Sequence, residues 1–200
     1  MKVINHASGK HDHFIGIGHT RWATHGGKED INAHPHCDYD MTLALVHNGM
    51  ITNFDEIKKE LENLGINPQS QTDTELVVLL TRYYKDNLNL STFDAFKKTF
   101  EWIEGSNTFL MMDKDQPSKL FCVKSAGPLY IGELKENKGF IVASEVAVFQ
   151  NYTTRYRNVP DSTIVEIDLN NLSQFTSEVH YLENEKLDLN IKPGYKTFLE

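Results

Sequence analysis

Three polar segments of the sequence carry side chains that could hold a charged small molecule and act on a carbonyl group. The first covers residues 19–26, where Arg21 follows directly on an apolar run. The planar guanidinium of an arginine in such a place suits a carboxylate, because it can donate two parallel hydrogen bonds. Taken alone, however, Arg21 could equally be an exposed side chain in a loop.

The other two segments offer donors and a carboxylate. Residues 46–49 end an apolar run with Asn48 and Gly49. A side-chain amide beside a backbone N–H can form an oxyanion hole, in which fixed donors meet the charge that develops on a carbonyl oxygen. Asn-Gly is also a common turn dipeptide. In residues 72–75, Asp73 could hold an ammonium group, although capping a helix is its alternative role. Together the three segments predict one amino-acid site.

Metal binding and disulfides are weaker interpretations of the same sequence. Histidines cluster in residues 32–36 and 11–13, but neither cluster comes with a thiolate pair or with a helical His-Glu-x-x-His arrangement. We therefore expect no metal. The two cysteines are Cys37 and Cys122, and no disulfide is expected between them. Cys122 lies in an apolar run, which predicts a small buried core residue.

The elements that must position these groups can be read from the spacing of apolar residues. Helices are predicted over residues 54–64, with Asn53 as N-cap and Glu56 in the capping-box position, and from Thr72 and Ser91 onward. Strands are predicted over residues 14–19, 42–47, 108–112, 119–124, 129–131, 140–143 and 163–167, with a turn at Asn48-Gly49. One block of helices between two sets of strands indicates an α+β fold whose sheets are covered by helices.

Bulk composition limits the partners. The 200 residues, 40% of them hydrophobic, suffice for one domain. The net charge of −8, with basic residues scattered along the chain, argues against nucleic acid as a partner. No apolar run approaches the roughly 20 residues that span a bilayer, and residues 1–13 show no secretory apolar stretch. We expect a cytoplasmic protein that does not bind membranes.

The segments His-Thr-Arg-Trp-Ala-Thr-His-Gly, Asn-Ala-His-Pro-His, Val-His-Asn-Gly and Thr-Asp-Thr-Glu resemble, in order and spacing, the glutaminase domain of the glucosamine-6-phosphate synthase family, also called glutamine-fructose-6-phosphate aminotransferase (isomerizing). The resemblance implies a four-layer α/β/β/α sandwich of the N-terminal-nucleophile hydrolase type that hydrolyses glutamine to glutamate and ammonia without a cofactor. It divides the chain into a poorly structured segment (1–13), an incomplete amidotransferase domain (14–175) and an extension that matches the start of the family's interdomain linker (176–200).

The resemblance also implies roles for individual residues. Asn48 and the N–H of Gly49 would form the oxyanion hole, and Trp22 would lie on the loop that closes the site. The groups that would hold the α-carboxylate and α-ammonium of glutamine are Arg21, Thr24, His25 and Asp73.

The family's nucleophile has no counterpart in the sequence. In the family it is the thiol of an N-terminal cysteine whose own α-amine acts as base. Here the chain begins with Met1 and Lys2, and a chain starting at Cys37 or Cys122 would lack Arg21. The family's first strands are also absent, which should leave an unpaired sheet edge, and so are its sugar-phosphate domains. The resemblance therefore implies a truncated glutaminase domain that is inactive alone.

Two alternatives remain open. The chain could be a non-catalytic protein that binds glutamine or another partner with the retained pocket. It could also be one half of a split glutaminase, whose separate chain carries the N-terminal cysteine or the isomerase domains.

Overall fold

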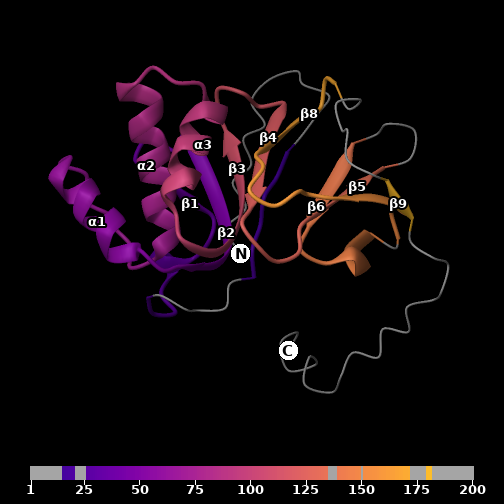
Figure 1. The fold of residues 1–200 in the computed structure, drawn as a ribbon, viewed down its shortest axis with the longest axis horizontal. Coiled ribbons are helices and arrows are strands. Elements are labelled where there is room, and N and C mark those ends of the chain that lie inside the picture. Colours follow the sequence, from indigo (N-terminus) through magenta and orange to yellow (C-terminus); the bar gives the residue numbers. More distant parts are fainter. Residues whose placement is uncertain (1–14, 21–25, 135–138, 150, 172–178, 182–200) are drawn as a thin grey trace.

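Two antiparallel sheets lie face to face, and helices cover one of them (Figure 1). The structure is a computed structural model, and it describes residues 15–20, 26–134, 139–149, 151–171 and 179–181. Sheet A runs in the order β1 (His36–Cys37), β2 (Leu43–Ile51), β3 (Gly105–Asp113), β4 (Lys119–Lys124) and β8 (Val165–Asp168). Sheet B runs in the order β6 (Phe140–Ala143), β5 (Tyr130–Glu133), β7 (Arg155–Asn158) and β9 (His180–Tyr181).

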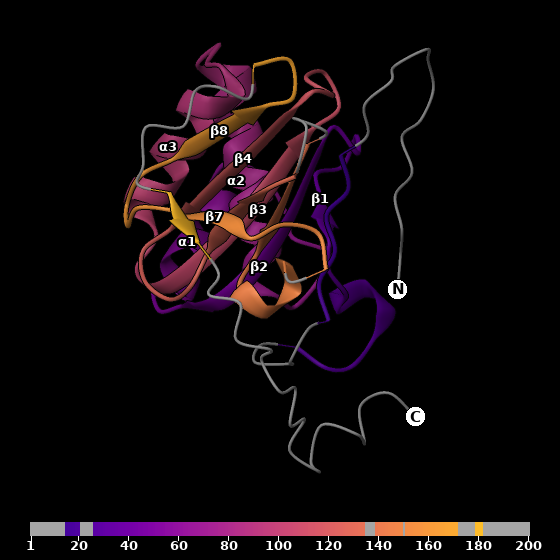
Figure 2. The same cartoon turned by 90° about the vertical axis from the view of Figure 1, so that its right-hand side faces the viewer.

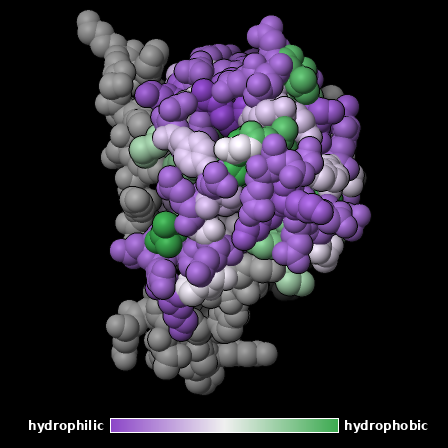
Figure 3. Space-filling model, turned by 90° about the vertical axis from the view of Figure 1, so that its left-hand side faces the viewer, coloured by the Kyte–Doolittle hydropathy of each residue, from purple (hydrophilic) through white to green (hydrophobic). Residues whose placement is uncertain are grey.

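Three helices pack on the outer face of sheet A: α1 (Phe54–Asn63), α2 (Asp73–Asn87) and α3 (Thr92–Trp102). They begin where the sequence predicts. The Thr72 hydroxyl accepts from the N–H of Glu75, and the Ser91 hydroxyl accepts from that of Asp94, so both side chains cap their helices. Figure 3 shows that the surface on this side of the molecule is mostly hydrophilic.

The cap predicted for α1 is only half right. Asn53 occupies the N-cap position, but its side chain makes no capping hydrogen bond. Its amide instead donates to the carbonyl of Trp102 and accepts from the N–H of Glu104, at 2.9 and 3.0 Å. Asn53 therefore ties the start of α1 to the end of α3, because a tertiary partner competes with the local cap.

The alternation of residues along sheet A divides the core into two layers. In β2, β3 and β4, odd-numbered residues such as Phe109, Phe121 and Val123 pack against the helices, whereas even-numbered residues such as Leu120 and Cys122 face sheet B. Figure 2 shows the same order of layers, with β7 of sheet B in front of β3 and the helices behind. Cys122 is fully buried, as predicted, and burial raises the pKa of its thiol to about 12.

Two predictions about strands are wrong. The sequence predicts a strand over residues 14–19, and the described part of it, residues 15–19, lies in no strand of the structure. Ile15 and Ile17 still pack between the sheets, so the side-chain alternation is present without a backbone ladder. The turn expected at Asn48-Gly49 is also absent: β2 continues through both residues to Ile51, because β3 extends back to Gly105 and pairs with it.

The fourth layer implied by the resemblance is represented, among the residues that the structure describes, by the 3-10 helix η3 (Val146–Phe149). The ring of Phe149 lies against Gly132 of β5, where an added Cβ would come within 2.9 Å of it. Ile131, the neighbour of Gly132, points between the sheets, so η3 covers the outer face of sheet B. The boundaries expected at residues 13/14 and 175/176 lie outside the described residues.

A buried ion pair fastens α2 and α3 to the end of β3. The Asp113 carboxylate accepts from Lys85 Nζ at 2.7 Å, from the N–H of Asp115 at 2.9 Å and from the hydroxyl of Thr92. Burial alone would raise the pKa of Asp113, but these donors more than offset it and the pKa falls below its ordinary value of 3.8.

The stability of the protein should therefore depend on Asp113 in acid. Because the folded pKa is the lower one, the unfolded state binds more protons as the pH falls below 3.8, and stability is lost through the folded pKa. We expect Asp113→Asn to cost about 1–3 kcal/mol at neutral pH and to flatten this part of the profile. Urea unfolding between about pH 3 and pH 6 measures both effects. Equal acid sensitivity in wild type and variant would contradict this role.

Candidate functional site

The candidate site lies along the edge of β2 that faces away from β3. Two backbone N–H groups on this edge already have side-chain partners: His47 N lies 3.4 Å from His34 Nδ1, and Ile51 N lies 3.1 Å from Asp73 Oδ2. Backbone groups of a strand point to alternate sides, so the N–H of Gly49, midway between these two, points to the same edge. Among the described residues, β1 covers this edge only as far as Leu45.

The backbone of Gly49 is held tightly by β3. Its φ is +145°, which an L-residue rarely adopts, and an added Cβ would lie 2.1 Å from the carbonyl oxygen of Ser106. Asn107 is its Cα partner across the ladder. The glycine is thus required by the close approach of two strands, and its N–H is fixed toward the edge.

Asn48 and Asp73 approach this edge from different sides. Asn48 is exposed and belongs to the even-numbered residues that face sheet B. Asp73, at the first turn of α2, is only 4% exposed and comes from the helical side. It does not cap the helix, because Thr72 does. The structure therefore brings the Gly49 N–H and the Asp73 carboxylate to the same edge of β2. The Asn48 side chain lies next to this edge, on the face of sheet A that points toward sheet B.

The predicted residues Arg21, Trp22, Thr24 and His25 lie outside the described residues, so their roles stay predictions. The described chain on either side of them lies near the edge of β2. The ring of His19 is 4.6 Å from that of His34. On the other side, the N–H of Gly27 donates to Gln71 Oε1, two residues before Asp73.

Sequence reasoning missed a group of buried polar residues behind Gly49. The His47 ring lies between Thr74 Oγ1, 3.0 Å from Nδ1, and Asn107 Oδ1, 2.9 Å from Nε2. His34 Nε2 lies 3.1 Å from the same Thr74 oxygen. The signal was present: His47 and Asn107 occupy odd positions of strands, where the pattern calls for apolar residues facing the helices.

Two of the histidines that could suggest a metal, His34 and His36, have other partners, whereas His11 and His13 lie outside the described residues. His36 Nε2 lies 2.9 Å from Thr72 Oγ1, and His34 contacts Thr74 and the backbone of His47. Within the described part of the chain, no group of three or more His, Cys, Asp or Glu side chains could hold a metal ion. Of the helices that are described, none is long and apolar enough to cross a membrane.

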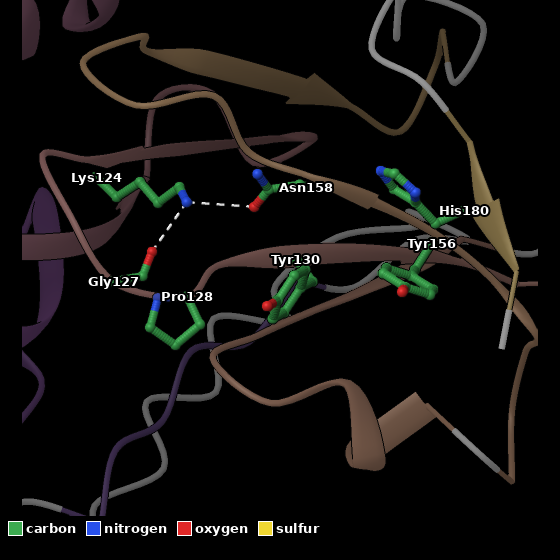
Figure 4. Close-up of a pocket in the computed structure, with 7 residues that line it drawn as sticks. All are labelled: Lys124, Gly127, Pro128, Tyr130, Tyr156, Asn158 and His180. Atoms are coloured by element: carbon green, nitrogen blue, oxygen red, sulfur yellow. Dashed lines mark hydrogen bonds between the residues drawn. The ribbon is translucent and has the colours of Figure 1, made fainter.

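A hollow of about 390 Å³ lies at sheet B, apart from the edge of β2 (Figure 4). Lys124 Nζ reaches it from the end of β4, and it has three acceptors: Gly127 O at 2.9 Å, Asn158 Oδ1 at 3.2 Å and Asp161 Oδ1 at 3.1 Å. Since an ammonium group has three N–H donors, all of them are used. The rest of the lining consists of Pro128, Tyr130, Tyr156 and His180. Lys124 therefore holds sheet A to sheet B and is not available to a ligand.

Neither cysteine can act on a molecule bound at the edge of β2. Cys122 is fully buried between the sheets, and its raised pKa keeps it a thiol. Cys37 lies in β1 and pairs with Ala44, which precedes the site in β2. Neither of them is in a disulfide bond.

The sequence is similar to known proteins over most of its length. The sequence profile of the family described as glutamine amidotransferase domain matches residues 19–151. The glutamine-fructose-6-phosphate aminotransferase (isomerizing) of Fusobacterium nucleatum is 38% identical over 191 residues, which are 92% of this chain and 30% of that protein. The enzyme of the same name from Chlamydia trachomatis is 44% identical over 138 residues, 68% of this chain and 22% of that protein. The chain thus spans less than a third of the length of these relatives.

Solved structures show the same fold. The glutamine phosphoribosylpyrophosphate amidotransferase of B. subtilis, complexed with ADP and GMP, matches with a TM-score of 0.56 at 23% identity, over 76% of this chain and 34% of that one. This likeness confirms the predicted α+β fold of the N-terminal-nucleophile hydrolase type. Since the family profile covers two thirds of the chain, including Asn48, Gly49 and Asp73, the protein belongs to the glutamine amidotransferase domain family.

Proposed function

We propose that this domain binds glutamine along the edge of β2 and polarises its side-chain amide. The carbonyl oxygen of the amide accepts from the N–H of Gly49 and from the Asn48 side chain, while Asp73 receives the α-ammonium. The α-carboxylate goes to Arg21, helped by Thr24 and His25, and Trp22 closes the site. Fixed donors of this kind stabilise the negative charge that forms on the oxygen when the amide is attacked.

The observation that carries this proposal is the spacing on one edge. The N–H of Gly49 and the N–H to which Asp73 binds are two residues apart on β2, a separation of about 7 Å along a strand. An extended glutamine measures about 5 Å from its amide carbon to its α-nitrogen. With a hydrogen bond at each end, glutamine spans the two groups, and asparagine, shorter by one methylene, does not.

Hydrolysis needs a nucleophile that is neither Cys37 nor Cys122, so in this proposal the thiol comes from outside the 200 residues, on the same or on a second chain. The ammonia released would then serve a transfer to fructose-6-phosphate, the activity that the names of the relatives print. Cys37 and Cys122 form no disulfide, which fits the reducing cytoplasm as the place of the reaction.

A second function is favoured by the burial of Cys122 and the position of Cys37. Without an added thiol, the chain is a glutamine-binding protein whose pocket polarises the amide and leaves it intact. Adding a second chain that carries an N-terminal cysteine separates the two functions, because only a glutaminase then releases ammonia.

Glutamine should raise the melting temperature of the isolated chain. At about ten times its Kd, a ligand that binds only the folded state stabilises by about 1.4 kcal/mol, or about 3–6 °C for a domain of this size. Differential scanning calorimetry with glutamine and asparagine measures this effect. We expect a shift with glutamine only. The absence of a shift, or equal shifts with both amino acids, would refute the proposed site.

A further inference from the structure

The ring of His47 lies directly behind the backbone of Gly49. A Cβ built on Gly49 would be 3.0 Å from His47 Nε2. The ring is stacked on Phe109, with centroids 4.4 Å apart and an interplanar angle of 24°, and the residue is only 4% exposed. Whatever fixes this ring therefore also fixes the surface against which Gly49 rests.

The hydrogen bonds of His34 define which of its ring nitrogens carries the proton. The backbone N–H of His47 can only donate, so His34 Nδ1 accepts. A neutral His34 then carries its proton on Nε2, which faces Thr74 Oγ1 at 3.1 Å. His34 therefore donates to the Thr74 hydroxyl.

Asn107 lies at the other end of this series of hydrogen bonds. Its Nδ2 donates to the carbonyl oxygen of Glu104 at 3.0 Å, which fixes the orientation of the amide. Asn107 Oδ1 is then the atom that faces His47 Nε2 at 2.9 Å, and a carbonyl oxygen can only accept. His47 Nε2 therefore carries a proton and donates to Asn107, the residue paired with Gly49 across the ladder.

The Thr74 hydroxyl connects the two histidines. It accepts from His34, so its single proton is free to donate, and its nearest acceptor is His47 Nδ1 at 3.0 Å. The Asp73 carboxylate lies farther away, with Oδ1 3.4 Å from the Thr74 hydroxyl and 3.6 Å from His47 Nδ1. The hydrogen bonds thus run in one direction, from His34 through Thr74 and His47 to Asn107.

We infer that His47 is a positioning residue, which fixes the Gly49 N–H for the carbonyl oxygen of the substrate. This series of hydrogen bonds holds His47 as a neutral imidazole protonated on Nε2. This inference rests on the proposed function only for the identity of the substrate. The series of hydrogen bonds joins α2, β2 and β3 behind the Gly49 N–H, so the position of this donor is fixed before any ligand binds. A preorganised donor of this kind needs no rearrangement when charge develops.

Nitrogen-15 NMR of the histidine side chains tests the protonation state without a ligand. We expect His47 to show one protonated nitrogen, Nε2, and one unprotonated nitrogen, Nδ1, at neutral pH. If Nδ1 carries the only proton, or both nitrogens are protonated, the hydroxyl of Thr74 cannot donate to the ring and the inference is wrong.

Three variants of α2 test the positioning. Thr74→Val removes the hydroxyl, Thr74→Ser restores it, and Thr81→Val is the matched control. Thr81 is another fully buried threonine of α2, bonded to the carbonyl of Val77 and to Thr99, away from His47. In the absence of ligand, Thr74→Val should shift the amide resonance of Gly49 and convert part of His47 to another protonation state. Thr74→Ser and Thr81→Val should show the Gly49 amide resonance and the His47 protonation state of the wild type.

Glutamine titration separates this inference from the proposed function. Wild type, Thr74→Ser and Thr81→Val should bind with a downfield shift of the Gly49 amide proton, and Thr74→Val should bind about tenfold more weakly, the effect of one lost hydrogen bond. If wild type does not bind glutamine, the proposed function fails while the ligand-free spectra still decide the positioning. If Thr74→Val matches Thr81→Val both in the ligand-free spectra and in glutamine affinity, the series of hydrogen bonds has no positioning role.

Discussion

Gly49→Ala should lower the free energy of unfolding by about 3 kcal/mol or more, because two costs add at one position. A residue with a Cβ at a φ of +145° pays about 1–3 kcal/mol in backbone strain. Its Cβ would also come within 2.1 Å of the Ser106 carbonyl oxygen, and backbone cannot yield as a flexible side chain can. Relief requires β2 and β3 to move apart, which displaces the N–H that we assign to the oxyanion hole.

Gly65→Ala is the matched control for this effect. Gly65 also has a positive φ, +77°, but nothing lies within 4 Å of an added Cβ. This variant should therefore show only the strain of the backbone, about 1–2 kcal/mol. Chemical unfolding of both variants gives the difference. Equal losses would mean that β3 does not approach β2 as closely as the structure has it.

The helices could be predicted from the sequence because their signals are local. Thr72 and Ser91 cap the next turn with their own hydroxyls, and the apolar residues that follow recur at helical spacing. Asn53 shows the limit of such signals. Its sequence context is that of a cap, but its partners, Trp102 and Glu104, lie about fifty residues away and are invisible to a local pattern.

The two errors in the strands have a common physical cause: a strand is defined by its partner. Residues 15–19 have the alternation of a strand and pack as one, yet the ladder is absent. Asn48-Gly49 has the composition of a turn, yet β3 pairs with both residues. Composition reports which conformations a residue tolerates, and pairing over sixty residues decides which one it adopts.

The sequence predicts that Arg21, Asn48 and Asp73 share one site, and for the described part of it the structure adds the groups that hold Gly49 and Asp73 in place. Asp73 could be proposed from its carboxylate, but its place on β2 follows only from its bond to the N–H of Ile51. The sequence predicts no role for the buried His47 and Asn107, because neither residue belongs to a known catalytic arrangement. Polar residues at core positions of a strand are nevertheless costly unless they are paired, which marks them as candidates for a functional role.

Asp73→Asn should weaken the binding of glutamine by about 100-fold while leaving the fold intact. The carboxamide oxygen can still accept from the N–H of Ile51, so the contact between α2 and β2 survives. What is lost is the negative charge that we assign to the α-ammonium. A hydrogen bond to a charged group contributes about 1.5–3 kcal/mol, which corresponds to a factor of about 10–150 in Kd, and the burial of Asp73 at 4% exposure places the loss toward the upper end.

Asp38→Asn provides the same substitution at another buried carboxylate. Asp38 is 3% exposed, accepts from the N–H groups of Thr42 and Leu43, and pairs with Arg82 at 3.0 Å. It should lower stability without changing glutamine affinity, because it lies at the start of β2, away from Gly49. Isothermal titration calorimetry of the two variants and the wild type, with circular dichroism to confirm folding, measures the contrast. If Asp73→Asn binds glutamine as tightly as wild type does, the ammonium is held elsewhere. A 100-fold loss confined to Asp73→Asn would place the charged end of the ligand at the first turn of α2, and with it the reactive end at Gly49.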